Sequence, residues 1–332
     1  MAQVIRWGIL GCGKIARKFA SDLQLVNDAQ LVSIASRNPE NGQAFAADFS
    51  VKNIHTTYEA LATDNEVDVI YIATPHNLHF ENTMLCLQHR KAVLCEKPFA
   101  INARQSAQMI ALAQQQNVFL MEALWSKFLP HYQMLQQYLQ QGRLGKIMSV
   151  LINFGFKPVP PYAPRIFEPS LAGGTMMDIG IYNVFFALSV LGKPDMIDAV
   201  MTPAYTGVDE QCAVTFRYNN GAIAQLFSSF SSNLSTEADI NGTEGRIHLS
   251  NRFYAPGNNF EYYSNNTEGR ELIPIEKEAG FGYQYEARHV GDCLRKGLTE
   301  SPIMGFADTM LLIETLDAIR AKAGIVYDAD KI

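Results

Sequence analysis

The run Gly8-Ile9-Leu10-Gly11-Cys12-Gly13-Lys14-Ile15-Ala16 decides the fold class of this 332-residue chain. An apolar, β-rich stretch leads into it and a stretch with helical spacing follows it, so it fits G-x-G-x-x-A between a strand and a helix. The first glycine permits a tight turn and the second lets the backbone approach a pyrophosphate. The helix start at Lys14, Ile15 and Ala16 offers N–H groups to phosphate. The run therefore predicts a dinucleotide-binding strand, turn and helix.

Alternating strand and helix patterns extend from this run as far as residue 122. Short β-rich runs lie at 4–10, 31–36, 69–73, 92–95 and 118–121. Between them, apolar residues at helical spacing occupy 14–25, 41–49, 58–63, 79–88 and 103–116. This alternation is typical of β-α-β units, and it predicts an α/β fold with a doubly wound parallel-sheet (Rossmann) domain over residues 1–122.

The pattern changes after Pro130. A helix is expected at 131–141, followed by β-like runs that short turns separate. These runs are 146–156, 211–218, 222–229, 235–241, 245–249, 260–263 and 271–275, and further helices are expected at 175–191, 283–296 and 306–322. Residues 123–332 are therefore predicted to form an α+β domain with an open, mostly antiparallel sheet. The C-terminal helix of this domain is a candidate to pack back on the first domain.

Composition excludes several classes of protein. With 33 acidic against 27 basic residues the net charge is −6, which provides no positive field for nucleic acid or anionic lipid. The longest apolar runs, such as 184–191, are shorter than the roughly 18 to 20 residues that cross a bilayer, and the start offers no secretion signal. Five scattered cysteines favour thiols in a reducing compartment. We expect a cytoplasmic protein with neither a membrane nor a nucleic acid as partner.

The end of the second predicted strand bears on the 2′ position of the nucleotide, about 20 residues beyond the glycine-rich turn. An acidic residue there would bind the 2′-hydroxyl of NAD and repel a 2′-phosphate. This chain has Ser36-Arg37 instead. A guanidinium binds phosphate through charge-assisted bonds, and the serine hydroxyl adds a donor, so NADP(H) is favoured over NAD(H). The alternative is that Arg37 is a solvated residue at a strand end.

The sequence Thr74-Pro75-His76-Asn77-Leu78-His79 follows another predicted strand, at the carboxyl edge where ligands bind in such sheets. Two histidines three residues apart suggest a metal. Because no Asp, Glu or Cys stands at ligand spacing nearby, no metal is expected. We expect Thr74, Pro75, Asn77 and His79 to pack against the cofactor.

Glu96-Lys97-Pro98 ends the next predicted strand. Proline restricts the residue before it to extended conformations, so Lys97 is held outside any helix at the edge where a nicotinamide is expected. Most lysines are solvated surface cations, but this placement favours a functional role for Lys97 and a cofactor contact for Glu96.

Gly173-Gly174-Thr175 opens the long helix of the second domain, and Asp178 and Tyr182 lie four residues apart on one helical face. Gly180 is expected to leave room beside them for a flat ligand. The alternative is that Tyr182 is a core residue with a satisfied hydroxyl and that Asp178 only favours the first turn of the helix.

Together these motifs resemble the Gfo/Idh/MocA family, named after glucose-fructose oxidoreductase and inositol dehydrogenase. The resemblance rests on the Gly11-x-Gly13 loop, Thr74-Pro75, Glu96-Lys97-Pro98 and the Gly-Gly...Asp-x-Gly helix, and it spans the whole chain. Residues 121–125, 153–155, 178–182 and 285–290 are similar to the branch that contains dimeric dihydrodiol dehydrogenases and NADP-dependent D-xylose dehydrogenases.

The resemblance implies a Rossmann domain followed by an α/β domain whose open sheet forms a homodimer, or a tetramer, with the active site between the domains. Lys97 matches the catalytic lysine of the family. Tyr182 stands where most members have His, but where the dihydrodiol branch has a Tyr acid/base. Phe185 replaces an Asp of the broad family pattern, which argues against inositol-type chemistry.

The implied reaction has Tyr182 take the proton of a substrate carbinol as hydride moves to C4 of the nicotinamide. The pKa of free tyrosine is about 10, and an opposite charge nearby lowers a pKa by about 1 to 3, which is the role expected of Lys97. Asp178 is expected to orient Lys97 or a substrate hydroxyl. Candidate substrate contacts are Trp125, Phe154, Arg165, Phe281 and Tyr283. Aromatic faces suit a sugar and a cyclohexadiene diol alike, and core packing is the alternative for these residues.

The expected activity is therefore NADP(H)-dependent oxidoreduction of a sugar, diol or dicarbonyl. Two alternatives stay open: a non-enzymatic NADP-binding, sugar-responsive regulator, and a glycosidase of the same fold that holds NAD tightly. The regulator needs the dinucleotide loop but has no use for Lys97, Asp178 and Tyr182 together. Arg37 disfavours the NAD-dependent glycosidase.

Overall fold

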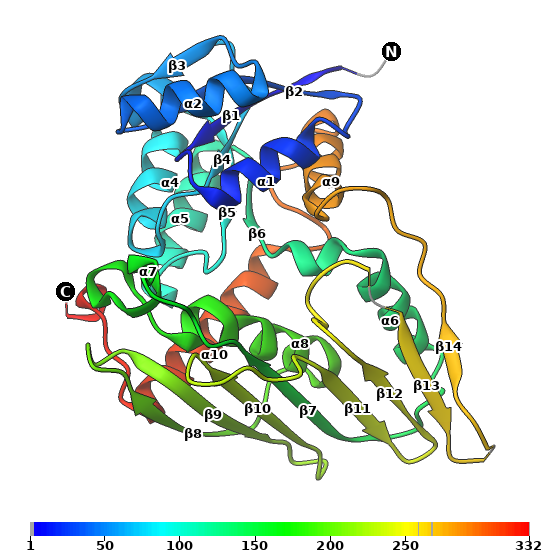
Figure 1. Cartoon of the computed structure of the whole chain (residues 1–332). Helices are drawn as coiled ribbons and strands as arrows, with labels where there is room; N and C mark the ends of the chain where they lie inside the picture. Colours follow the sequence, from blue (N-terminus) through cyan, green and yellow to red (C-terminus); the bar gives the residue numbers. More distant parts are fainter. Residues whose placement is uncertain (1–2, 258, 267, 332) are drawn as a thin grey trace. The chain divides into compact units, whose positions relative to one another are not determined.

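The computed structural model describes residues 3–257, 259–266 and 268–331, and it divides the chain into two compact units (Figure 1). Unit 1 comprises Met1–Phe128 and Glu278–Met310, and unit 2 comprises Leu129–Lys277 and Leu311–Ile332. The predicted division at residues 122 and 123 therefore differs from the observed one, because a long C-terminal segment returns to unit 1.

Six parallel strands form the sheet of unit 1, in the order β3-β2-β1-β4-β5-β6. The strands are β1 (Ile5–Leu10), β2 (Ala29–Ala35), β3 (Asn53–His55), β4 (Val69–Ile72), β5 (Ala92–Glu96) and β6 (Leu120–Ala123). The helices between them are α1 (Lys14–Leu23), α2 (Pro39–Phe49), α3 (Tyr58–Ala62), α4 (His79–Gln88) and α5 (Ala103–Gln116), with short 3-10 turns η1 (His76–Leu78) and η2 (Trp125–Phe128). The doubly wound prediction is confirmed, and β3 is a strand that the sequence pattern did not indicate.

Both faces of this sheet are buried, which explains the nearly continuous apolar runs of its strands. On one face Phe19 of α1 stacks on Tyr71 of β4, with 3.8 Å between the ring centroids, and Trp7 of β1 packs beside it. Leu10 and Ile72 join a separate hydrophobic cluster with residues of α3, α4 and α5. The helices therefore cover the sheet on two sides.

The segment that returns to unit 1 is held by a buried carboxylate. Asp22 of α1 is fully buried, and it accepts hydrogen bonds from the backbone N–H groups of Phe281 and Tyr283, each at 2.8 Å. These groups lie at the start of α9 (Tyr283–Arg295). Tyr283 also stacks on Trp125, with 4.7 Å between centroids and 9° between planes. These contacts explain why the segment Glu278–Met310 belongs to unit 1.

Unit 2 contains an eight-stranded sheet in the order β14-β13-β12-β11-β7-β10-β9-β8. The strands are β7 (Ile147–Gly155), β8 (Met196–Pro203), β9 (Asp209–Arg217), β10 (Ile223–Ser229), β11 (Ala238–Gly242), β12 (Gly245–Leu249), β13 (Phe260–Ser264) and β14 (Glu271–Ile273). All neighbours are antiparallel except β7 and β10, which are parallel. The predicted open, mostly antiparallel sheet is confirmed, with β8 as an additional strand.

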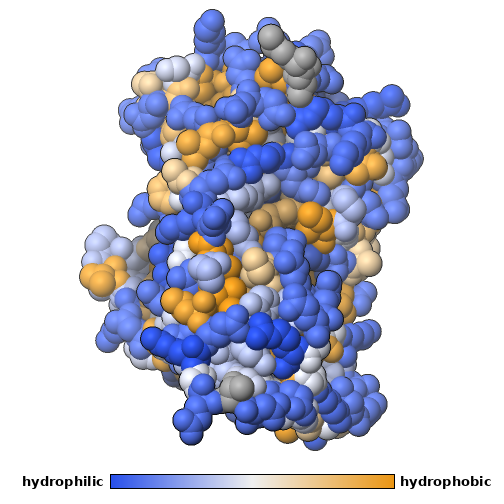
Figure 2. Space-filling view, turned by 90° about the vertical axis from the view of Figure 1, so that its right-hand side faces the viewer, coloured by the Kyte–Doolittle hydropathy of each residue, from blue (hydrophilic) through white to orange (hydrophobic). Residues whose placement is uncertain are grey.

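The helices of unit 2 lie on one face of this sheet in Figure 1. They are α6 (Pro130–Gln140), α7 (Pro164–Phe167), α8 (Ile181–Leu191) and α10 (Phe306–Ala323), whose first turn belongs to unit 1, together with the short turns η3 (Pro169–Leu171), η4 (Met176–Gly180) and η5 (Asp328–Asp330). The segment Pro169–Leu191 is apolar and long enough to cross a membrane, but 83% of its most apolar window is buried. Such a helix is typical of a protein core. The face of the molecule in Figure 2 is mostly hydrophilic, with hydrophobic residues in separate patches.

We expect replacement of the Asp22 side chain to destabilise unit 1. Asp22→Ala leaves the N–H groups of Phe281 and Tyr283 without their charged acceptor, which should lower the free energy of unfolding by about 3 kcal/mol. Urea unfolding followed by tryptophan fluorescence measures this change, because Trp7 and Trp125, the two tryptophans of the chain, both lie in unit 1. The control is Asp48→Ala, which removes a half-exposed partner of Arg17 and should cost less than about 1 kcal/mol. Equal unfolding midpoints for the two variants would contradict this account.

Candidate functional site

The glycine-rich loop of unit 1 leaves a helix start open to a ligand. Gly11 has a φ of +96°, and a Cβ there would lie 3.1 Å from the carbonyl oxygen of Ala73, so this turn requires glycine. Gly13 precedes α1 and provides no side-chain cap, and a Cβ at Gly13 would meet no atom within 4 Å. The first N–H groups of α1 and the open space above them fit a pyrophosphate group.

Ser36 and Arg37 follow β2 directly. The buried Ser36 hydroxyl donates to the carbonyl oxygen of Asn38 at 2.7 Å, so in this structure it is engaged within the loop. Asn38 in turn caps α2 by accepting from the N–H of Asn41 at 3.0 Å. The exposed Arg37 guanidinium lies 5.4 Å from the ring centroid of Tyr58. Of the two residues predicted to bind a 2′-phosphate, Arg37 is the one that faces solvent.

The loop after β4 is fastened to the loop after β5 through His79. This ring is fully buried, and its Nδ1 and Nε2 lie 2.7 Å and 2.9 Å from the carbonyl oxygens of Pro98 and Thr74. Burial lowers the pKa of His79. The buried Oδ1 of Asn77 has no hydrogen-bond partner among the described residues, so it is available to a bound molecule. His79 thus holds the loop, whereas Asn77 provides an unused acceptor.

Lys97 follows a carboxylate that is fixed on both sides. The buried Glu96 accepts from the hydroxyl of Tyr71 and from the backbone N–H of Lys97, the latter at 3.2 Å. The peptide bond between Lys97 and Pro98 is cis. Glu96 therefore anchors the backbone from which the Lys97 side chain extends, and Lys97 itself is partly exposed.

Sequence reasoning did not single out two further acids in unit 1. Glu122 of β6 is buried and accepts from the N–H of Phe99 at 3.1 Å, and burial raises the pKa of Glu122 to about 7. Glu286 of α9 is fully buried, and neither of its carboxylate oxygens has a partner among the described residues. Burial and then the charge of Glu96 raise the pKa of Glu286 above its ordinary range. No spacing in the sequence indicates that these two acids lie near Glu96, because the three residues come from separate elements.

In unit 2 the segment that carries Asp178 and Tyr182 begins with a π turn. Residues Met176–Gly180 form η4, a π-helical turn, and α8 continues from Ile181. The sequence predicted one continuous α-helix. An apolar run is buried in the same way in a π turn and in an α-helix, so the pattern does not distinguish them. Such turns are frequent at functional sites. A Cβ at Gly180 would lie 2.9 Å from the Ser228 hydroxyl and 3.0 Å from the sulfur of Met176, so the expectation of room for a flat ligand beside Gly180 is wrong.

Asp178 and Tyr182 are both buried, with exposed fractions of 6% and 7%. Asp178 forms an ion pair with the half-exposed Arg165, at 2.6 Å between Oδ2 and Nη1. The Tyr182 ring packs against Tyr254, with 4.7 Å between centroids, and against Phe154 at 6.1 Å. Tyr254 in the loop after β12 was not predicted from the sequence, which gives no signal for a loop residue of this kind.

The remaining candidate substrate residues divide between the units. Trp125, Phe281 and Tyr283 belong to unit 1, whereas Phe154 belongs to unit 2 and stacks on Tyr254 at 4.4 Å between centroids. Trp125 and Tyr283 are nearly fully buried against each other, and Phe281 is 46% exposed. In unit 1, therefore, Phe281 is the most accessible of the expected aromatic contacts.

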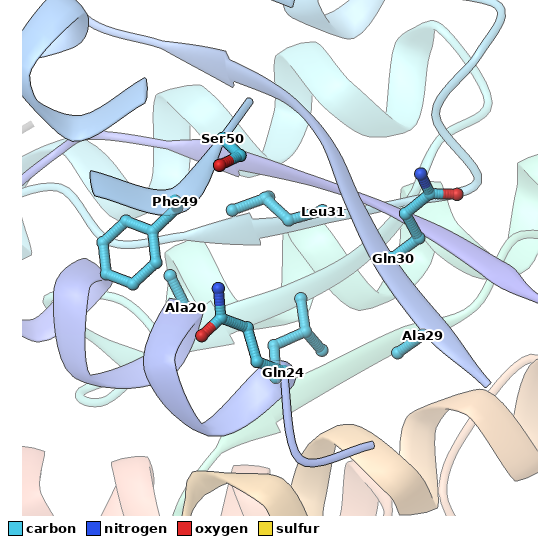
Figure 3. Close-up of a pocket in the computed structure, with 8 residues that line it drawn as sticks. Ala20, Gln24, Ala29, Gln30, Leu31, Phe49 and Ser50 are labelled. Carbon is cyan, nitrogen blue, oxygen red and sulfur yellow. The ribbon is translucent and has the colours of Figure 1, made fainter. Parts of the chain in front are cut away.

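A surface pocket of unit 1 lies away from all of these residues. Gln24, Gln30, Phe49 and Ser50 line it together with apolar residues of α1 and β2 (Figure 3). Because Gln30 lies near the amino end of β2, the pocket opens at the edge of the sheet opposite to the glycine-rich loop. Across the described parts of the chain, no group of three or more His, Cys, Asp or Glu side chains is arranged to hold a metal ion.

Family models match a part of each unit. A family model described as "Oxidoreductase family, NAD-binding Rossmann fold" (GFO_IDH_MocA) matches residues 5–124, and the GFO/IDH/MocA C-terminal domain matches residues 132–248. Trans-1,2-dihydrobenzene-1,2-diol dehydrogenase from Mus musculus is 38% identical over 339 residues, which cover 99% of this chain and 100% of the relative. The Homo sapiens protein of the same name is 36% identical over 343 residues, with the same coverage.

Solved structures share the fold at lower identity. A 3-ketoreductase from Actinomadura kijaniata, solved with NADP and TDP-benzene, has a TM-score of 0.86 at 24% identity and covers 97% of this chain and 98% of its own. An aldose-aldose oxidoreductase from Caulobacter crescentus, solved with glycerol, has a TM-score of 0.88 at 23% identity with the same coverage. Both family models and the full-length relatives agree, and this chain belongs to the GFO/IDH/MocA family of oxidoreductases.

Proposed function

We propose that this protein is an NADP(H)-dependent oxidoreductase that interconverts a carbinol and a carbonyl in a sugar, diol or dicarbonyl. The observation that carries the proposal is the full-length similarity to dihydrodiol dehydrogenases at 38% identity, in a chain that retains Lys97, Asp178 and Tyr182. Enzymatic relatives of this kind favour an enzyme over a sugar-responsive regulator. They likewise favour net oxidoreduction over a glycosidase reaction.

Bound NADP(H) supplies or accepts a hydride at C4 of its nicotinamide. The open start of α1 at Gly13 and the free acceptor of Asn77 suit the pyrophosphate and a polar group of the nucleotide. The exposed Arg37 suits the 2′-phosphate through charge-assisted bonds, and its position over Tyr58 restricts where the guanidinium can lie. These features favour NADP(H) over NAD(H).

Tyr182 is proposed as the acid/base. Its phenolate removes the hydroxyl proton of a substrate carbinol, and its phenol returns a proton to the oxygen in the reverse direction. Phe154 and Tyr254 enclose the Tyr182 ring and exclude water from it. The Lys97 ammonium stabilises the phenolate, and the Glu96 carboxylate fixes the backbone from which Lys97 extends. Asp178, paired with Arg165, is proposed to orient a substrate hydroxyl.

The substrate is proposed to be a small molecule with vicinal oxygens and an apolar face. Dihydrodiol dehydrogenases are named after a cyclic diol, and the related structures include an aldose-aldose oxidoreductase. Aromatic side chains at Phe154, Phe281 and Tyr254 suit the C–H faces of such rings. All five cysteines are free thiols, which suits the proposed cytoplasmic location.

A homodimer through the open sheet face of unit 2 is proposed as the assembly. The cross-strand register places Met196, Val200, Ile223 and Leu151 on the face opposite to α8. Their exposed fractions are 52%, 66%, 43% and 43%. Large apolar residues exposed on one sheet face suit a protein–protein interface, and two copies related by a twofold axis would bury the same residues on each partner.

Variants of the two proposed catalytic residues should separate binding from chemistry. We expect Lys97→Met and Tyr182→Phe each to lower kcat by about 100-fold or more, because each removes a proton-transferring or charge-stabilising group. The absorbance of NADPH is followed with a panel of aldoses, diols and diketones. Tryptophan quenching by NADPH should stay near the unaltered Kd. Lys146→Met and Tyr218→Phe, which remove a lysine and a tyrosine elsewhere, serve as controls. Near-normal turnover in either catalytic variant refutes its role.

The cofactor preference should depend on Arg37. We expect Arg37→Ala to weaken NADPH binding by about 10-fold or more and to leave NADH binding nearly unchanged, since only NADPH carries the 2′-phosphate. Calorimetric titration with both nucleotides measures this difference. Arg90→Ala, at another exposed arginine of unit 1, is the control. Equal weakening of NADPH and NADH binding would contradict a phosphate contact.

The assembly should depend on the sheet face. We expect the double variant Val200→Asp, Ile223→Asp to sediment as a monomer, because it would bury four charges across the proposed interface. Analytical ultracentrifugation measures the mass, with Val159→Asp as the control, since Val159 is 80% exposed outside the sheet. A monomeric unaltered protein, or an unchanged mass in the double variant, would rule out this dimer.

A further inference from the structure

The strand β9 begins with a buried carboxylate that touches the turn before Asp178 and Tyr182. Asp209 is fully buried. Its Oδ2 accepts from the hydroxyl of Thr175 and from the backbone N–H of Met176, both at 2.6 Å. These two groups stand at the start of the π turn η4, seven and six residues before Tyr182. One oxygen atom therefore fixes both a side chain and a backbone group of this turn.

The glycine directly before Thr175 is explained by the same carboxylate. Gly174 has a φ of +113°, and a Cβ there would lie only 2.1 Å from Oδ1 of Asp209. Oδ1 itself has no hydrogen-bond partner among the described residues. The backbone of Gly174 thus passes so close to Asp209 that no side chain fits, and the turn has no freedom to move toward the strand.

A second contact holds the same turn from the C-terminal segment. The hydroxyl of Tyr327 donates to the carbonyl oxygen of Gly173 at 2.8 Å. Tyr327 is 4% exposed, and its backbone N–H donates to Asp330, which pairs with the buried Arg320. Gly173, Thr175 and Met176 are therefore held by side chains from two separate parts of unit 2.

The other end of the segment is also fixed. Asn183, the residue after Tyr182, donates from Nδ2 to the carbonyl oxygen of Phe227 and to the hydroxyl of Ser228, both at 3.1 Å. Tyr182 thus lies between two attachment points, one at Asp209 and one on β10. A shift at either point changes where the phenol lies.

A charged carboxylate at this buried position lowers the stability of the fold. Burial raises the pKa of Asp209 to about 6 from 3.8. Because the folded-state pKa is raised, the stability that Asp209 contributes is present at low pH and is lost as the pH rises through about 6. At neutral pH the charge therefore opposes folding, while it shortens and strengthens the two bonds to the turn.

We propose that Asp209 is a positioning residue for Tyr182, holding the Gly173–Thr175 turn and the π turn so that the phenol meets the substrate oxygen. The inference rests on the proposed role of Tyr182 as acid/base. Asp209 touches neither substrate nor cofactor in this proposal, and it acts through Thr175 and Met176.

The test compares variants that alter these bonds with variants that do not. We expect Asp209→Asn and Thr175→Val to lower kcat by about 10-fold or more, since a displacement of about 1 Å can cost about 100-fold. Thr175→Ser keeps the hydroxyl and should restore turnover, and the Kd for NADPH should stay within about twofold in all of them. Tyr218→Phe is the matched control, because it removes a bond from a tyrosine hydroxyl to Gly192 at the opposite end of α8.

Two further measurements separate positioning from loss of folding. Hydrogen exchange of a peptide spanning residues 173–183 should quicken in Asp209→Asn while the exchange of β10 stays unchanged. In a Tyr182→Phe background, Asp209→Asn should lower kcat by less than about twofold further, because residues that act through one another are non-additive. If Asp209→Asn fails to fold, hydrogen exchange and the Tyr182→Phe comparison are made with Thr175→Val and Thr175→Ser instead.

The outcomes distinguish this inference from the proposed function. Full activity of Asp209→Asn or Thr175→Val, or equal effects of Asp209→Asn with and without Tyr182, would overturn the positioning role. Full activity of Tyr182→Phe would overturn the proposed function, and this inference with it.

Discussion

Parallel pairing of β1, β4 and β5 is the constraint on which the candidate site depends. Parallel strands need crossover connections, so their carboxyl ends emerge at the same edge of the sheet. The Gly11 loop, Thr74 and Glu96 are far apart in sequence, and this pairing brings them to one edge. His79 then links two of the three loops through backbone carbonyl oxygens. Unit 1 therefore offers one continuous edge for a dinucleotide.

Much of this arrangement could be predicted from the sequence, because periodicity and turn residues act locally. The glycine-rich run, the alternating strands and helices of unit 1 and the open sheet of unit 2 follow from such signals, whereas the short strand β3 does not. The parallel pairing of β7 with β10 and the return of α9 to unit 1 could not be predicted, since both depend on contacts between distant residues. The same is true of Glu286 and Tyr254, whose surroundings come from separate elements. The π turn could not be predicted either, because the same apolar run is buried equally well in a π turn and in an α-helix.

Buried carboxylates recur where the structure must hold a backbone segment in place. Asp22, Glu96 and Asp209 each accept a hydrogen bond from a backbone N–H group. Desolvation of a carboxylate is unfavourable, and donated hydrogen bonds offset it only when the geometry is good. Uncharged Ser and Thr side chains also accept hydrogen bonds from backbone N–H groups, with a smaller loss of hydration free energy, as Thr57 does at the start of α3. The acids stand at the return of α9, beside Lys97, and before Tyr182, which are the positions that the proposed reaction uses.

The chain passes between the units at residues 128, 277 and 310, and neither unit is a single stretch of sequence. During synthesis the N-terminal strands leave the ribosome long before α9, so Asp22 has no backbone partners until Phe281 and Tyr283 have been made. Unit 2 depends in the same way on Tyr327, which is made long after its partner Gly173. Neither unit can be inherited or exchanged as one uninterrupted gene fragment, and a truncation before Tyr327 removes a buried contact from unit 2.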